Sequence, residues 1–192
     1  MLDLTSQNVA ILGAGRSGLA AAKLASRCGA LVTVFDSRGP EVFASFPEEL
    51  KTHANANAET GAATLSDLVI ISPGIETQGE FAQSFAVNSG GLWGEIELSW
   101  RCYAGKTIGI TGTNGKTTTA ELVNILVRAT SKSCQPCGNY GVPFAEVVLQ
   151  DEVPEVVALE LSSFQLETTV DFKPDAVIWL NFSADHMDRY HD

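Results

Sequence analysis

The segment from Thr107 to Val123, TIGITGTNGKTTTAELV, combines an apolar run, a glycine-containing loop with a lysine, and a helical pattern. Glycines in such a loop let successive backbone N–H groups converge on one anion, and the start of the helix adds partial positive charge. Lys116 can neutralise terminal phosphate oxygens, and Thr117 offers a hydroxyl to Mg²⁺. The segment therefore predicts a phosphate-binding loop between a buried strand and a helix.

The spacing of this loop departs from the general pattern G-x-x-x-x-G-K-[ST]. Position 110 is isoleucine, and the glycines present are Gly109, Gly112 and Gly115. The alternative is a glycine-rich turn with a surface lysine. The helical pattern after the loop favours a phosphate site. It consists of apolar residues at i, i+3, i+4 and i+7, namely Leu122, Ile125, Leu126 and Ala129.

A second glycine loop, GAGRSG at residues 13–18, lies nearer the N-terminus. We expect a strand at 9–12 before it, then a helix at 19–28 that ends at Gly29, and a strand at 31–35 that ends at Asp36. In this βαβ arrangement G-x-G-x-x-G binds the pyrophosphate of a nucleotide, and an acid about 20 residues later contacts its ribose or base. A tight turn without a ligand is the alternative.

Polar residues follow three further apolar runs, at the edge where open parallel sheets bind ligands. Residues 68–71 are followed by Ser72, Pro73 and Gly74, residues 156–159 by Glu160, and residues 177–180 by a segment with Asp185 and His186. Glu160 at a strand tip is well placed to hold Mg²⁺ directly or through water. The alternatives are ordinary loop residues, a solvated strand end and a structural histidine.

These elements predict an α/β protein with a Rossmann-like N-terminal domain, followed by an incomplete P-loop-type mononucleotide-binding α/β domain. The phosphate-loop strand opens a fresh αβ series at residue 107, so we expect the domains at 1–94 and 95–192. A short helix is expected at 95–100. The composition of residues 36–66 indicates one or two short elements but does not define their positions.

Composition limits the partners of the chain. Its 192 residues include 12 basic and 23 acidic side chains, a net charge of −11 that repels nucleic acid and acidic membranes. A phosphate ligand must then be held by helix N-termini, single basic residues and metal ions. No apolar run approaches the roughly 18 to 20 residues of a membrane helix. The start MLDLTSQ carries an acid where a signal peptide carries bases, so we expect a cytoplasmic protein.

Four cysteines are present, Cys28, Cys102, Cys134 and Cys137. The last two form CQPC, which could be a redox pair or half of a zinc site. A redox pair of this type is expected to open a helix, whereas Pro136 and Gly138 predict a loop. Reduced, structural thiols are the favoured interpretation.

Taken together, these features resemble the Mur ligases over essentially the whole chain. GTNGKTT at 112–118 is similar to that family's version of the phosphate loop, which several of its branches share. Other motifs resemble the branch that adds D-glutamate to UDP-N-acetylmuramoyl-L-alanine. They are GAGRSG at 13–18, SPG at 72–74, GEIEL at 94–98, LELSSFQLE at 159–167 and DHMDRY at 185–190.

The resemblance implies a ligand for each loop, with UDP rather than NAD in the first domain and ATP in the central domain. It implies a UDP-substrate site of Arg16, Ser17, Asp36, Ser37, Arg38, Ser72, Pro73, Gly74, Asn139, Ser162, Gln165 and His186. It implies an ATP site of Gly112, Thr113, Asn114, Gly115, Lys116, Thr117 and Thr118. Lys116 and His186 are the implied catalytic residues, and Thr117, Glu160 and His186 the implied Mg²⁺ ligands.

The implied reaction is ATP-dependent amide formation through an acyl phosphate, with UDP-N-acetylmuramoyl-L-alanine and D-glutamate as substrates in peptidoglycan precursor synthesis. Mg²⁺ and Lys116 would neutralise the charge that develops as a carboxylate attacks the γ-phosphate. Family members are longer, so part of the central domain and the C-terminal domain are expected beyond Asp192. The full-length enzyme is expected to be a monomer. This fragment is expected to be inactive alone and, with an unfinished sheet, to self-associate.

Two other classes of function remain open. An NAD-dependent oxidoreductase would use GAGRSG and Asp36, but it leaves Lys116 and Glu160 without a role. A non-catalytic nucleotide-binding module would bind the same ligands without turnover. Titration with NADH against UDP separates the first alternative from the ligase, and phosphate release separates the second.

Overall fold

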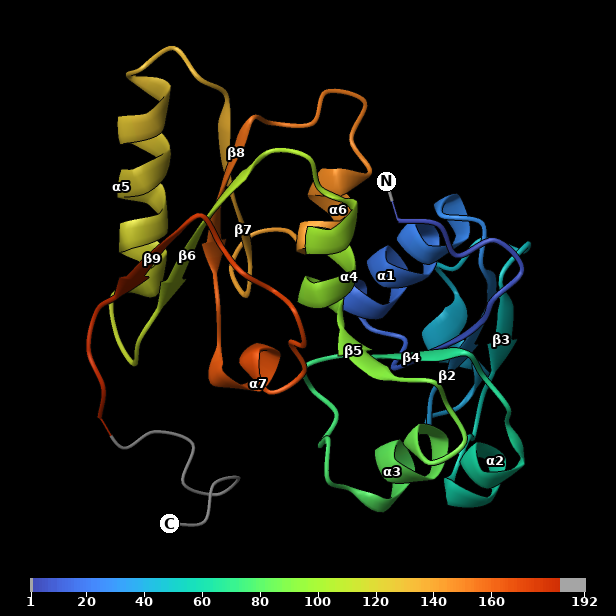
Figure 1. Ribbon diagram of the computed structural model, residues 1–192. Coiled ribbons are helices and arrows are strands. Elements are labelled where there is room, and N and C mark those ends of the chain that lie inside the picture. The colour runs from blue at the N-terminus through green and yellow to red at the C-terminus, as the bar shows by residue number, and fades with distance from the viewer. Residues whose placement is uncertain (1, 184–192) are drawn as a thin grey trace. The chain divides into compact units, whose positions relative to one another are not determined.

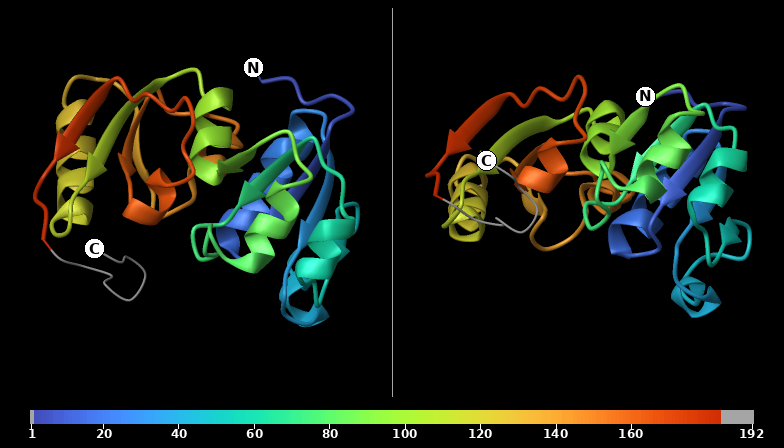
Figure 2. Two further views of the ribbon diagram at one scale, coloured as in Figure 1. Left: turned by 60° about the horizontal axis from the view of Figure 1, so that its bottom comes forward. Right: turned by 90° about the horizontal axis from the view of Figure 1, so that it is seen from below.

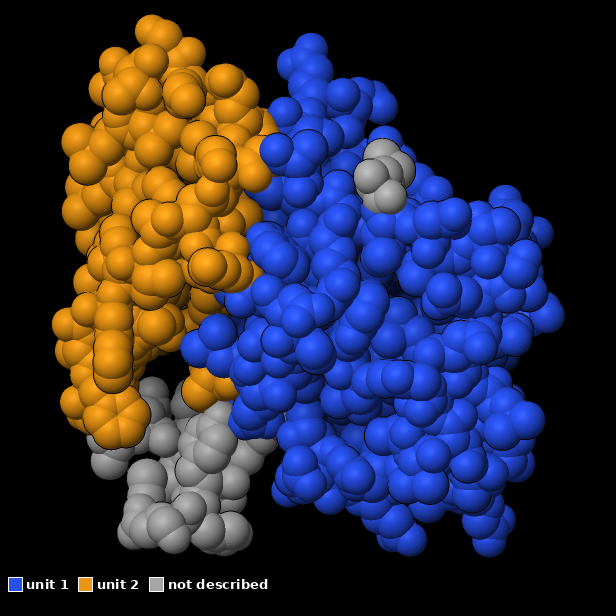
Figure 3. Space-filling view, viewed as in Figure 1, with its two compact units in different colours: residues 1–104, 143–153, 164–172 blue, residues 105–142, 154–163, 173–192 orange. Residues whose placement is uncertain are grey.

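The computed structural model describes residues 2–183 (Figure 1). The chain forms two compact units, coloured separately in Figure 3. Unit 1 comprises residues 1–104, 143–153 and 164–172, and unit 2 comprises residues 105–142, 154–163 and 173–192. The helix after residue 94 belongs to unit 1, and the chain returns to unit 1 twice after unit 2 has begun. The assignment of one function to each domain stays a prediction.

Within the described residues, unit 1 contains a five-stranded parallel sheet with helices on both faces (Figures 1 and 2). Its strands are β1 (Asn8–Leu12), β2 (Leu31–Phe35), β3 (Lys51–His53), β4 (Leu68–Ile71) and β5 (Leu92–Gly94). Its helices are α1 (Arg16–Arg27), the 3-10 helix η1 (Pro40–Phe43), α2 (Ala58–Ala63), α3 (Glu80–Ala86), α4 (Glu95–Cys102) and α6 (Phe144–Val148). The short helix α7 (Ser163–Leu166) belongs to unit 1 from Phe164 onward.

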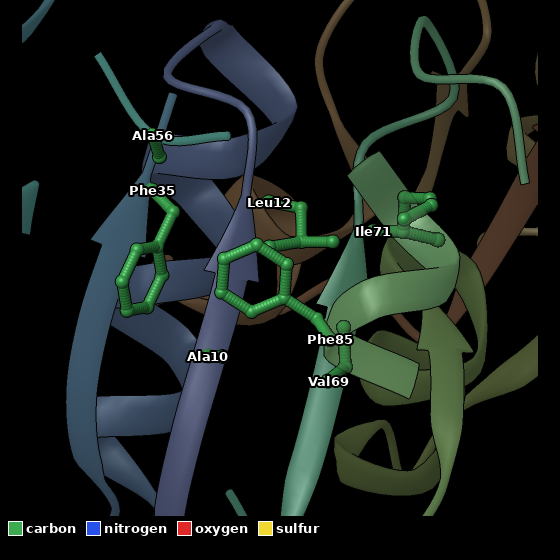
Figure 4. Close-up of a cluster of buried hydrophobic side chains, with 8 residues drawn as sticks. Ala10, Leu12, Phe35, Ala56, Val69, Ile71 and Phe85 are labelled. Carbon is green, nitrogen blue, oxygen red and sulfur yellow. The ribbon is translucent and has the colours of Figure 1, made fainter. Parts of the chain in front are cut away.

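The spatial order β3-β2-β1-β4-β5 confirms the expected Rossmann-like arrangement. The predicted strands at 31–35 and 68–71 coincide with β2 and β4. All four residues of β4 are buried, because a parallel strand covered on both faces must be apolar throughout. On the face covered by α3, Phe85 packs over the strands beside Leu12 and Ile71 (Figure 4). Its ring centroid lies 4.8 Å from that of Phe35.

Unit 2 contains a four-stranded parallel sheet within the part of the chain that the structure describes. Its elements are β6 (Lys106–Thr111), α5 (Lys116–Arg128), β7 (Cys134–Gly138), β8 (Val156–Glu160) and β9 (Ala176–Trp179). The order β7-β8-β6-β9 places β6 between β8 and β9. Residues Ile110 and Glu160 are partners in the β6–β8 register, so the ends of these two strands lie side by side.

The helix predicted after Lys116 is present as α5, but the face predicted from its apolar spacing is not the buried one. Leu122, Ile125 and Leu126 are 53%, 61% and 67% exposed. The smaller residues Ala120 and Val123 pack on the sheet instead. Small side chains let the helix approach the strands closely, and this tertiary packing overrides the apolar count. The expected self-association stays a prediction, and this exposed apolar face supports it.

The prediction of a loop at CQPC is wrong. Residues Cys134–Gly138 form strand β7, which pairs with β8 along its length. A proline cannot donate to a ladder, but β7 is an edge strand of the described sheet, where a missing donor is tolerated. All four cysteines are free and buried, as the structural interpretation predicts.

Helix α4 carries two buried carboxylates that bind the segments returning to unit 1. Glu95 accepts a hydrogen bond from the backbone N–H of Ala145 at the start of α6, and another from Ser99. Glu97 accepts hydrogen bonds from the backbone N–H groups of residues 170–172 and from Arg101. Both carboxyl groups are at most 2% exposed. Residues 143–153 and 164–172 are therefore attached to the rest of unit 1 by hydrogen bonds inside its core.

Candidate nucleotide-binding sites

The glycine loop of unit 1 connects β1 to α1. The helix begins at Arg16, inside the predicted loop, and its N-cap is Gly15. At Gly18 a Cβ would lie 1.8 Å from the carbonyl oxygen of Gly13, so a side chain there would collide with backbone. Glycine at this position therefore lets the first turn of α1 pack directly on the loop. No side chain caps α1, and such a helix start is a general binding site for anions.

The SPG segment lies beside this loop because β4 pairs with β1. The backbone N–H of Ser72 donates to the carbonyl oxygen of Leu12, 3.0 Å away. The Ser72 hydroxyl is buried and has no hydrogen-bond partner in the part of the chain that the structure describes, and a Cβ at Gly13 would lie 2.8 Å from it. After β1 the chain adds β2 and β3 on one side of β1, and it then forms β4 on the other side. The two segments thus meet at the switch point where open α/β sheets bind ligands.

Asp36 at the end of β2 holds this loop in place. One carboxylate oxygen accepts hydrogen bonds from the Ala14 backbone, at 2.7 Å, and from the Arg38 guanidinium, at 2.8 Å. The other accepts from the backbone and side chain of Arg38. The hydrogen bonds from Arg38, opposed by burial and helped by Ala14, lower the pKa of Asp36 to about 2. The ionised group is 4% exposed, so it organises the loop and orients Arg38.

The other residues expected to contact a UDP substrate do not all come from this edge of the sheet. Arg16 pairs with Glu146 through two hydrogen bonds of 2.9 Å. Asn139 and Ser162 belong to unit 2, and Gln165 is buried in unit 1. The segments that follow the neighbouring strands β1, β2 and β4 contain Arg16, Ser17, Asp36, Ser37, Arg38, Ser72, Pro73 and Gly74, and the common UDP site of these residues stays a prediction.

In unit 2 the phosphate loop lies between β6 and α5, as predicted. Gly115 is the N-cap of α5 with φ +88°, a conformation that favours glycine. The Lys116 Nζ atom donates to the carbonyl oxygens of Gly112, at 2.7 Å, and Thr113, at 3.0 Å. Lys116 takes part in none of the ion pairs among the described residues. Its ammonium group therefore lies on the loop, with no carboxylate partner among residues 2–183, as a phosphate-binding lysine requires.

Glu160 lies next to the start of α5. Its Oε2 accepts a hydrogen bond from the Thr117 hydroxyl at 2.8 Å, and its Oε1 accepts one from the Asn139 side chain, also at 2.8 Å. The carboxylate is 3% exposed, and both donors are neutral. A buried carboxylate beside a hydroxyl offers the oxygen ligands that Mg²⁺ prefers. The predicted pair of Thr117 and Glu160 therefore fits a metal ion.

The third implied Mg²⁺ ligand, His186, lies outside the described residues, as does Asp185. Within residues 2–183, no group of three or more histidine, cysteine or acidic side chains is arranged to hold a metal ion. Thr117 and Glu160 alone make no complete metal site, and the remaining ligands would come from phosphate oxygens and water.

Asn181 is a loop residue that sequence reasoning missed. Its side chain accepts from the backbone N–H of Asn114 and donates to the carbonyl oxygen of the same residue, both at 3.0 Å. Its own carbonyl oxygen accepts from the backbone N–H of Thr113 at 3.2 Å. Asn181 thus supports the phosphate loop from the end of β9. No spacing rule signals this contact, because it depends on β9 lying next to β6.

Parallel sheets with glycine loops at strand-to-helix junctions define the class of nucleotide-binding α/β proteins. Two family models match this chain. "Mur ligase MurD-like, N-terminal domain" matches residues 7–90, and "Mur ligase middle domain" matches residues 110–192. The chain belongs to the Mur ligase family.

Curated relatives described as UDP-N-acetylmuramoylalanine--D-glutamate ligase match nearly all of this chain. The protein of Pelodictyon phaeoclathratiforme is 37% identical over 98% of this chain and 42% of its own length. That of Myxococcus xanthus is 36% identical over 98% and 43%, and that of Anaeromyxobacter dehalogenans is 38% identical over 99% and 42%. The chain thus spans less than half the length of these relatives.

Solved structures share the fold at low sequence identity. One is UDP-N-acetylmuramate:L-alanyl-gamma-D-glutamyl-meso-diaminopimelate ligase from Neisseria meningitides, with a TM-score of 0.58 and 17% identity over 98% of this chain and 64% of that chain. A murein peptide ligase from Psychrobacter arcticus has a TM-score of 0.56 and 18% identity over 95% and 44%. None of the described helices is long and apolar enough to cross a membrane.

Proposed function

We propose that this chain supplies the nucleotide-binding part of an ATP-dependent ligase that adds D-glutamate to UDP-N-acetylmuramoyl-L-alanine in peptidoglycan precursor synthesis, in the cytoplasm. The names of the relatives supply the substrates. The single observation that carries the proposal is the contact of Thr117 with Glu160 at 2.8 Å, next to a loop that holds Lys116. In an NAD-dependent oxidoreductase, Lys116 and Glu160 would have no role.

The glycine loop of unit 1 is the proposed site for the UDP moiety. The start of α1 would face the diphosphate, because it supplies positive charge, and the guanidinium of Arg38 could stack on the base. Both oxygens of Asp36 are engaged by Arg38 and by the Ala14 backbone. Asp36 therefore has little capacity left to accept a hydrogen bond from a ligand hydroxyl, and its proposed role at the UDP site is to hold the loop and orient Arg38.

The phosphate loop of unit 2 is the proposed site for ATP. Lys116 would leave its two carbonyl partners and pair with the terminal phosphates, while Thr117 and Glu160 would hold Mg²⁺. Bound Mg²⁺ would supply charge neutralisation for phosphoryl transfer. In the proposed reaction the muramoyl-alanine carboxylate becomes an acyl phosphate, and the amine of D-glutamate displaces the phosphate. Lys116 would stabilise the charge that develops on the transferred group.

The Ser72 hydroxyl supplies a test of the UDP site. This buried hydroxyl has no partner among the described residues, and rotation of the Ser72 side chain toward the switch point would let it donate a hydrogen bond to a ligand atom. Ser72→Ala should therefore weaken UDP binding by about 5- to 10-fold, the effect of one lost hydrogen bond, without lowering the melting temperature. Titration calorimetry with UDP and with NADH measures this, and we expect NADH not to bind.

Ser66 provides the matched control. Its hydroxyl is also buried without a partner within residues 2–183, but Ser66 precedes β4, whereas Ser72 follows it. Ser66→Ala should leave UDP affinity unchanged. Tight NADH binding without a UDP response would favour an oxidoreductase. A non-catalytic module would be indicated if a chain as long as the relatives released no phosphate with UDP-N-acetylmuramoyl-L-alanine, ATP and D-glutamate together.

A further inference from the structure

Two cysteines far apart in the sequence are in contact within unit 1. The Sγ atoms of Cys28 and Cys102 lie 3.4 Å apart, although 74 positions separate the two residues. Cys28 caps the C-terminus of α1, and Cys102 is the last residue of α4. Both side chains are buried, at 6% and 9% exposure. The ends of two helices therefore present a pair of thiols to each other.

The CQPC motif, by contrast, cannot form a disulfide in this fold. Cys134 and Cys137 lie on the same strand, three residues apart. Successive side chains of a strand point to opposite faces, so these two thiols project in opposite directions. Their Cα atoms are separated by about 10 Å along the strand, beyond the roughly 7 Å that a disulfide spans. The fold thus separates the pair that is close in sequence and joins a distant one.

A cavity gives small molecules access to the contacting pair. Its volume is about 160 Å³, and the two cysteines form part of its wall. Leu24, Val148 and Val153 make most of the rest of the lining apolar. A water molecule occupies about 30 Å³ of liquid, so a hydroperoxide of a few heavy atoms fits. The thiols are buried from bulk solvent yet reachable by a small neutral oxidant.

We propose that Cys28 and Cys102 form a dithiol modification site, which a small hydroperoxide converts to an intramolecular disulfide. One sulfur, as thiolate, attacks a peroxide oxygen. The O–O bond breaks, an S–O bond forms, and the leaving oxygen takes up the thiol proton. The second sulfur then attacks the sulfenic sulfur, the S–O bond breaks, and the hydroxyl leaves as water with the second thiol proton. With hydrogen peroxide the products are the disulfide and two molecules of water.

Burial of the thiols determines the rate at which they are oxidised. It raises the pKa of the Cys102 thiol to about 12, and the hydrogen bond with Cys28 adds to the shift. Arg27 and Tyr103 are the other ionisable side chains that line the cavity. The reactive thiolate is therefore scarce at neutral pH, so oxidation is slow there and faster in mild alkali. The contact between the two thiols makes closure of the disulfide efficient once the first sulfur has reacted.

The test is oxidation of the folded 192-residue chain with hydrogen peroxide at pH 8, followed by alkylation and mass spectrometry without reductant. We expect the chain to lose two hydrogen atoms and two of its four thiols to resist alkylation, with a cross-linked peptide pair containing Cys28 and Cys102. The new link closes a long loop, so the melting temperature should rise by roughly 5–10 °C and fall again on treatment with dithiothreitol.

Three serine variants complete the experiment. Cys28→Ser and Cys102→Ser should each abolish the loss of two hydrogen atoms and leave the remaining thiol to gain oxygen instead. Cys134→Ser is the matched control, because it removes a buried cysteine without touching the proposed pair, and it should oxidise like the parent chain. A link between Cys134 and Cys137, a link between two chains, or oxidation only after unfolding in urea would overturn the proposal.

Discussion

Replacing Lys116 with alanine should lower the affinity of the chain for Mg²⁺-bound ATP by at least about 100-fold. In the free protein the Lys116 ammonium lies 2.7 and 3.0 Å from two carbonyl oxygens of its own loop, and on ATP binding it would exchange these two neutral partners for charged phosphate oxygens. A charge-assisted hydrogen bond contributes about 1.5–3 kcal/mol, and two such bonds to phosphate oxygens account for the expected loss. Titration calorimetry of parent and variant with ATP in excess Mg²⁺ measures it.

A matched control separates this effect from a change in net charge. Lys132 is an exposed lysine of the same unit, and Lys132→Ala removes the same charge away from the loop. We expect this variant to bind ATP like the parent chain, and both variants to bind UDP unchanged. Loss of UDP binding in Lys116→Ala would mean that the two loops do not serve separate ligands.

Replacing Glu97 with alanine should destabilise unit 1 by about 3–5 kcal/mol. The Glu97 carboxylate is fully buried, and it accepts hydrogen bonds from the backbone N–H groups of Val170, Asp171 and Phe172 and from the Arg101 guanidinium. Its removal leaves these donors without their acceptor, and the loss of one partner of a buried ionic contact has a free-energy cost of this size. Urea unfolding followed by tryptophan fluorescence measures it. A change below about 1 kcal/mol would contradict this account of α4.

Glu95, two residues before Glu97 on α4, is the matched control, and we expect its contribution to stability to depend on pH. Burial, opposed by the hydrogen bonds from Ala145 and Ser99, raises its pKa from 4.5 to about 7. The folded chain therefore keeps a proton that the unfolded chain releases, so the contribution of Glu95 to stability is largest below pH 4.5 and falls as the pH rises toward 7. This fall amounts to about 3 kcal/mol. Glu95→Gln cannot ionise and should lack it.

The comparison is made by urea unfolding of parent and Glu95→Gln at pH values from 5 to 8. The glutamine oxygen can still accept from Ala145, so the variant should fold, and its advantage over the parent chain should grow with pH. A constant difference between the two proteins over this range would show that Glu95 is ionised in the folded state. Glu97→Ala, in contrast, should be destabilised at every pH in the range.

The elements that sequence reasoning placed correctly are those with strong local signals. Residues 31–35 and 68–71 are apolar runs bounded by turn-forming residues, and both are strands with the predicted ends. The phosphate loop was recognisable because its residue types follow from the chemistry of anion binding. Thr117 and Glu160 were predicted to act together, and the parallel register of β6 with β8 brings them into contact.

The predictions that failed depend on neighbours that the local sequence does not specify. Pro136 is typical of a loop, and only the edge position of β7 makes a strand possible. Leu122 and Ile125 form a regular apolar stripe, yet α5 packs through its smaller residues. Residues 36–66 contain η1, β3 and α2, which are too short for a periodic signal.

The functional contacts that sequence reasoning missed are long-range. Asn181 reaches the phosphate loop because β9 lies beside β6, and Asn139 reaches Glu160 because β7 lies beside β8. The sequence did not indicate that Glu97 is a buried hydrogen-bond acceptor, since an acidic side chain on a helix is usually solvated. Such partners follow from sheet order, which local patterns do not determine.

The most direct test of the central claim is a titration of UDP into the chain already saturated with Mg²⁺-bound ATP. UDP is proposed to bind the loop of residues 13–18 and the triphosphate the loop of residues 112–118, so the two ligands should bind together. We predict one molecule of UDP per chain, with the same affinity in the presence and absence of ATP. Competition between UDP and ATP, or loss of UDP binding once ATP is bound, would contradict the account.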